Sequence, residues 1–130
     1  MLEIILTMAF CLASTILIEG VLARIIFKIR DANSLMIVVA AQLLTNPIVV
    51  GICSVLIPSI LVSYGLGTET EQMMIWWLST GLFEVAAFIV EGFVYSNSGF
   101  DKPYAMSLVL NIFSFGIGLV FSAIWGIFVL

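Results

Sequence analysis

Two glutamates, Glu84 and Glu91, stand in an apolar stretch from Met73 to Tyr95 that contains no lysine or arginine. On a helix these glutamates would lie on one face, roughly 10 Å apart along the axis. A carboxylate in an apolar environment costs several kcal/mol unless it is paired, hydrated, metal-bound or protonated. We therefore expect the two side chains to turn toward an interior site that handles a proton or a cation.

The other long apolar stretches also carry strongly polar side chains. At a rise of about 1.5 Å per residue, these groups form a band in the inner half of a membrane. Carboxylate and amide oxygens suit hard cations, and acids inside a membrane are typical of proton and ion pathways. The sequence therefore predicts one substrate- or ion-binding site, formed by Glu84, Glu91, Glu19, Asn46, Asn111 and Gln42.

Structural roles are the alternative for several of these residues. Glu19 could pair with Arg24, although a spacing of five residues is poor for a helical ion pair. Asn46 precedes Pro47 and could satisfy carbonyl groups freed by a kink. Asn111 could hold two helices together through a hydrogen bond worth about 1 kcal/mol.

Motifs for covalent or hydrolytic chemistry are missing from the sequence. The chain has no histidine, no nucleophile elbow, no phosphate-binding loop and no H-E-x-x-H pattern. We therefore predict no catalytic residue, and the sequence indicates neither a cofactor nor a particular metal.

Composition places the predicted site in a membrane. The chain of 130 residues is 63% hydrophobic and only 9% charged, and its apolar runs are long enough to cross a bilayer. The net charge of −4 and the lack of a basic cluster argue against a nucleic-acid partner. The sequence therefore predicts an all-α integral membrane protein whose surroundings are the lipid bilayer.

Four spans are expected, in one domain covering residues 1–130 and forming a compact bundle. Turn signals divide the chain into helices at about 4–27, 35–63, 73–95 and 104–130. The second span is long for a bilayer and contains Pro47 and Pro58, which predicts tilt or a kink at one or both prolines.

Orientation follows from the positive charges. Arg24, Lys28, Arg30 and Lys102 lie at the loops that join spans one to two and three to four. Cytoplasmic loops are enriched in such residues, so loops 28–34 and 96–103 are predicted to be cytoplasmic and both termini outside. We expect the plasma (inner) membrane of a prokaryote.

Two short matches suggest an internal repeat. The segment 18–20 (IEG) resembles 90–92 (VEG), and an N-x4-G-I pattern begins at both Asn46 and Asn111. The two halves would be parallel helical hairpins, spans one to two and three to four.

In the last span Ser114, Gly118, Ser122 and Gly126 recur every four residues, which would permit close approach of a helix from the bundle or from another protomer.

Three functions remain open at this point. The first is a transporter or channel subunit that binds protons or a cation, which four spans would support only as a homo- or hetero-oligomer. The second is an accessory subunit of a larger membrane complex, and the third is an intramembrane enzyme with a glutamate pair.

Four short helices with an acid in the first are similar to the arrangement in small multidrug transporters. The local motifs of that family are absent, and the one-sided positive charges depart from its dual topology, so the sequence is assigned to no family.

Overall fold

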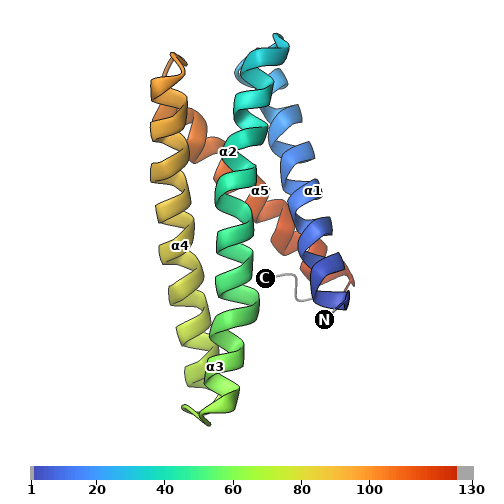
Figure 1. Ribbon diagram of the computed structural model, residues 1–130, viewed down its shortest axis with the longest axis vertical. Coiled ribbons are helices and arrows are strands. Elements are labelled where there is room, and N and C mark those ends of the chain that lie inside the picture. Colours follow the sequence, from blue (N-terminus) through green and yellow to red (C-terminus); the bar gives the residue numbers. More distant parts are fainter. Residues whose placement is uncertain (1, 126–130) are drawn as a thin grey trace.

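The computed structural model describes residues 2–125, and over these residues every regular element is a helix (Figure 1). The elements are α1 (Leu2–Ile25), α2 (Ala32–Gly51), the π-helical segment η1 (Ile52–Leu56), α3 (Ile57–Ser63), α4 (Glu69–Asn97) and α5 (Pro103–Trp125). Because α2, η1 and α3 follow one another without a break, the described chain forms four long rods. The all-α class is confirmed, and α2 and α4 are long and apolar enough to cross a membrane.

Helix boundaries differ from the predicted spans where polar residues form caps. Helix α2 begins at residue 32 rather than 35, because the Asp31 carboxylate accepts a hydrogen bond of 2.8 Å from the backbone N–H of Ser34. Helix α4 begins at residue 69 rather than 73, because Thr68 and Glu71 form a capping box. In that box the N–H of Thr68 donates to Glu71 Oε2 over 2.7 Å. The predicted end of the last span, at residue 130, lies outside the described residues.

The expected disturbance of the long second span takes the form of a π-helical turn. Pro47 lies inside α2, and Pro58 lies at the start of α3, directly after η1. In a π-helix the N–H of residue i+5 donates to the carbonyl of residue i, as Ile57 does at the end of η1. The same pattern would pair Cys53 with Pro58, which has no N–H. The indole N–H of Trp76 in α4 donates to the Cys53 carbonyl instead, over 3.0 Å.

The four rods form a closed ring of contacts, in which each rod touches two others. Helix α1 contacts α2 and α5, and α4 contacts α2 and α5. In Figure 1 the α1–α2 and α4–α5 connections lie at the upper end, while the start of α1 and the α3–α4 connection lie at the lower end. The positively charged residues therefore lie together at the upper end of the bundle: Arg24, Lys28, Arg30 and Lys102.

The apolar core lies near that same charged end. It joins the end of α1, the start of α2, the end of α4 and the start of α5, through Ala23, Ile29, Val38, Ala41, Tyr95, Met106 and Leu110. Helices α4 and α5 approach each other closely at Gly92. A Cβ atom added there would lie 2.7 Å from Cε1 of Tyr104 in α5 and nearer still to its Cδ1, so only glycine fits without a shift of the ring. The bundle is therefore tightly packed at the end that carries the cations.

The outer faces of the rods are covered by exposed apolar side chains. Leu17 in α1 is 66% exposed, Val62 in α3 is 73% exposed and Leu82 in α4 is 72% exposed. Leu43 in α2 and Ile112 in α5 are also exposed. Large exposed apolar surfaces are rare in soluble monomers.

Candidate ion-binding site

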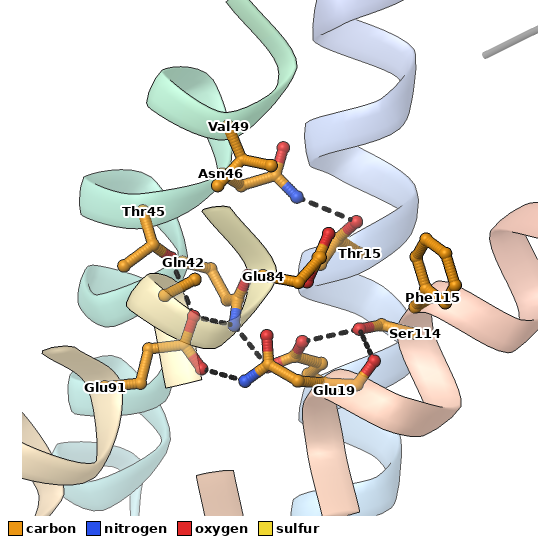
Figure 2. Close-up of a pocket in the computed structure, with 12 residues that line it drawn as sticks. Thr15, Glu19, Gln42, Thr45, Asn46, Val49, Glu84, Glu91, Ser114 and Phe115 are labelled. Atoms are coloured by element: carbon orange, nitrogen blue, oxygen red, sulfur yellow. Dashed lines mark hydrogen bonds between the residues drawn. The ribbon is translucent and has the colours of Figure 1, made fainter. Parts of the chain in front are cut away.

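One polar cavity lies in the interior of the bundle, next to the apolar core (Figure 2). All six residues of the predicted site line it: Glu19, Gln42, Asn46, Glu84, Glu91 and Asn111. The cavity leaves about 60 Å³ for the centres of water-sized spheres. A single water molecule needs about 10–15 Å³ by this measure, so the space suits a few waters or one small cationic group.

Glu19, which α1 places in the wall of the cavity, is completely buried. Its Oε1 accepts a hydrogen bond of 2.9 Å from the Ser114 hydroxyl of α5. Its Oε2 accepts a hydrogen bond from Nε2 of Gln42 in α2. Glu19 therefore connects α1 to two neighbouring helices.

Glu91, which α4 contributes, is only 1% exposed and receives more donors than Glu19. Its Oε1 accepts from the Thr45 hydroxyl over 2.7 Å and from Gln42 Nε2 over 3.1 Å. Its Oε2 accepts from Asn111 Nδ2 over 2.5 Å and from the Ser107 hydroxyl over 3.4 Å. Hydrogen bonds to an ionised group are stronger than those between neutral groups, so this environment suits a carboxylate that can exist in its charged form.

Gln42 joins the two acids. Its amide nitrogen donates one hydrogen bond to Glu19 and another to Glu91 (Figure 2). A primary amide has two N–H donors, so both are used on carboxylates that come from different helices. The two glutamates therefore lie on either side of one amide group. A change in the charge of one carboxyl group would alter the electrostatic energy of the other.

Glu84 and Asn46 extend the cavity away from the apolar core. Asn46 donates a hydrogen bond of 3.1 Å to the Thr15 hydroxyl, but its buried Oδ1 has no donor among the described residues. Glu84 is half-buried, and no described side chain donates a hydrogen bond to it. This part of the cavity therefore has more acceptors than donors.

No cation compensates the two central acids within the described part of the chain. Every donor to Glu19 and Glu91 there is a neutral amide or hydroxyl group. Arg24, the suggested ion-pair partner of Glu19, is exposed while Glu19 is buried. The described residues also contain no cluster of three or more His, Cys, Asp or Glu side chains placed to hold a metal ion. Two carboxyl groups whose described donors are all neutral can accept a proton, a cation or a group that donates hydrogen bonds.

Six further residues that the predicted set lacks line the cavity: Thr15, Thr45, Val49, Ala87, Ser114 and Phe115. Thr15 lies one helical turn before Glu19, a spacing that places both on one face. Ser114 belongs to the ladder of small residues expected to permit close approach of a helix from the bundle or from another protomer, and its hydroxyl donates to Glu19 of α1 within the bundle. The surroundings of Gly118, the side chain of Ser122 and the whole of Gly126 lie outside the described part of the chain.

Comparisons with known proteins add no relative to this picture. No protein-family model, curated protein or solved structure matches the chain. A functional proposal therefore rests on the chemistry of the cavity and on the surface of the bundle.

Proposed function

We propose that this protein is a small multi-pass membrane transporter or channel subunit whose interior carboxylates bind protons or a cation. One observation carries the proposal. Glu19 and Glu91, from two different helices, meet in a buried polar cavity where their described partners are all neutral. Acids buried within membrane helices face a bundle interior or a water-filled cavity and are typical of ion and proton pathways.

The membrane setting is supported by the surface and by the length of the rods. Exposed apolar side chains lie on each rod, and lipid chains would cover them without an energetic cost. The α2–η1–α3 rod and α4 are long enough to span a bilayer, and α1 and α5 would supply the other two spans. With the positive charges at one end, that end would face the cytoplasm and both termini would lie outside, in the inner membrane of a prokaryote.

Packing supports a route of access from outside or from the side of the bundle. The apolar core separates the cavity from the positively charged end. The cavity continues instead toward Thr15, Asn46 and Glu84, in the direction of the opposite end. A cation would therefore reach the acids from that side in this conformation, and release toward the cytoplasm would require the core to open.

The proposed parallel repeat fits the closed packing order. Glu19 of α1 and Glu91 of α4 both line the cavity, and so do Asn46 of α2 and Asn111 of α5. Two hairpins related by an axis along the membrane normal would place matching residues around one centre. Because the cavity is small, a continuous pathway for a larger substrate would need an oligomer, either with a second copy or with another membrane protein.

An accessory subunit of a larger complex is the second candidate function. The observation that favours it is Glu84, which is half-buried and has no described hydrogen-bond donor. A lysine or arginine from a partner helix could pair with this carboxylate. Co-purification of a larger protein after mild detergent extraction, and its loss in Glu84→Gln, would favour this function over the first.

The transporter proposal is tested with the full chain in proteoliposomes. A pH-sensitive dye inside the vesicles reports proton movement when gradients of Na⁺, K⁺ or small organic cations are applied one at a time. The expected result is a proton flux driven by at least one cation, lost in Glu19→Gln and in Glu91→Gln. Glu69→Gln is the matched control, since it removes an exposed acid at the start of α4, and it should behave as the unsubstituted protein does.

Two results would count against the proposal. One is a flux of normal rate in Glu91→Gln protein that is folded by circular dichroism. The other is infrared difference spectra, with and without each cation, in which no glutamate carboxyl band changes.

A further inference from the structure

A second cavity lies on the outer side of α4 and α5 and forms an apolar groove between them. It has a volume of about 220 Å³ for the centres of water-sized spheres. Its lining consists of Gly81, Glu84, Val85, Phe88, Leu108, Asn111, Ile112 and Phe115. Val85 and Ile112 are more than half exposed, at 56% and 59%, so the groove faces the surroundings of the bundle. In a membrane it would open to lipid.

The groove and the polar cavity share part of their walls. Glu84, Asn111 and Phe115 line both. Glu84 and Asn111 are the only two residues with polar side chains that line the groove in the described part of the chain, and both belong to the acid-bearing cavity as well. A molecule lying in the groove would therefore meet its polar partners only at the boundary with the interior site.

This inference rests on the function proposed above and names a substrate class for it. We infer that the site binds a lipid-soluble primary amine in its ammonium form, with the alkyl chain in the α4–α5 groove and the ammonium group in the polar cavity. The amine would enter laterally, from the bilayer, past Glu84.

The chemistry of the cavity selects the head group. An ammonium group has three N–H donors and no acceptor. The cavity offers the complementary set, because Glu84 has no described donor and Oδ1 of Asn46 is buried without one. In their ionised forms Glu19 and Glu91 would favour a cation. The phenyl ring of Phe115, which lines both spaces, would lie beside the positive group as aromatic rings do at cation sites.

The size of the two spaces selects the shape of the ligand. The polar cavity, at about 60 Å³, suits a small ammonium group, and a trimethylated nitrogen would bring no N–H donor to the free acceptors there. Along α4 the groove runs from Gly81 to Phe88, a distance of about 10 Å at the helical rise. Because Glu84 lies between these two ends, a straight chain that starts at Glu84, such as an octyl group, would fill one part of the groove and extend past its end.

Binding of radiolabelled octylamine to the full chain in lipid nanodiscs tests the inference, with empty nanodiscs as background. Unlabelled octylamine, octyltrimethylammonium and octanol serve as competitors. Two variants test the two spaces, Glu84→Gln for the charge and Gly81→Leu for the groove. A Cβ at Gly81 meets no atom within 4 Å, so leucine can extend into the groove without displacing the backbone. Gly20→Leu is the matched control, because Gly20 is equally open and lines neither space.

The expected result is saturable binding for which octylamine competes at least about tenfold better than octanol and octyltrimethylammonium. Glu84→Gln and Gly81→Leu should each weaken it about tenfold, and Gly20→Leu should not. Equal competition by octanol would mean that the groove holds only acyl chains, and unchanged binding in Gly81→Leu would exclude the lateral route. Either result overturns the inference. If octylamine does not bind while cation-driven proton flux persists, only this inference fails; if that flux is absent as well, the proposed function fails with it.

Discussion

Replacement of Gln42 by leucine tests whether the two central acids form one unit. Leucine has a similar size, but it provides no donor. The substitution removes the hydrogen bonds from Gln42 to Glu19 and to Glu91. Glu91 would retain three described donors, whereas Glu19 would retain only Ser114.

The magnitude follows from those two bonds. Interhelical hydrogen bonds in membrane proteins contribute about 0.6 kcal/mol on average and up to about 1.7 kcal/mol. Loss of two such bonds predicts a decrease of about 1–3 kcal/mol in the free energy of unfolding. Most of this decrease should come from Glu19, because it has fewer remaining donors.

Reversible unfolding in mixed micelles, followed by circular dichroism as the fraction of denaturing detergent rises, measures this change. Gln72→Leu is the matched control. Gln72 donates to the Leu66 carbonyl at the exposed start of α4, so its loss should cost no more than about 0.5–1 kcal/mol. A double-mutant cycle of Gln42→Leu with Glu19→Gln gives the coupling between the two side chains.

A coupling energy near zero would refute the bridging role of Gln42. The same holds for a Gln42→Leu protein as stable as Gln72→Leu. In either case the hydrogen bonds of the cavity would contribute nothing that water or neighbouring groups could not replace.

Two other predictions concern the ends of α4. Gly92→Ala should decrease the free energy of unfolding by about 1–3 kcal/mol, because the added methyl group would overlap the ring of Tyr104. Gly81→Ala, at an open position, is the control and should leave the free energy of unfolding nearly unchanged. Equal stability of the two variants would contradict the close approach of α4 and α5 at Gly92. At the other end, the backbone N–H and the hydroxyl of Thr68 hold the pKa of Glu71 below its ordinary value. The ionised capping box therefore adds stability above the ordinary glutamate pKa, and this contribution is lost as the pH falls through the lowered pKa. The amide resonance of Thr68 should titrate at that lowered value in NMR spectra, and a shift that persists in Glu71→Gln would assign the titration to another group.

Much of the helical organisation could be predicted from hydropathy and turn residues. The four rods correspond to the four predicted stretches, since long apolar runs separated by glycine, asparagine and charged residues leave few alternatives. The starts of α2 and α4 were misplaced because their first residues are polar. Asp31 and Thr68 begin these helices through hydrogen bonds, which an apolar pattern does not register.

Part of the lining of the cavity was predictable from the sequence, but the hydrogen bonds between its residues were not. A polar side chain on a mostly apolar helix turns away from lipid, so residues such as Glu19 and Asn111 were expected to converge. Which donor meets which acceptor depends on the rotation and height of each helix to within a few ångströms, and single-helix spacing contains no such information. The bridge formed by Gln42, and the opening of Glu84 onto a lateral groove, are therefore visible only in three dimensions.

The bond between the Trp76 indole and the Cys53 carbonyl gives the protein a built-in optical probe. This hydrogen bond links α4 to the π-helical segment η1 of the neighbouring rod. Sliding of α4 along that rod would break the bond and change the polarity around the indole ring. Trp77, whose ring centroid lies 4.9 Å from that of Trp76, and Trp125 also emit, and phenylalanine substitutions would remove their signals. Emission from the remaining tryptophan would then show, without any attached dye, whether filling the interior moves these two rods apart.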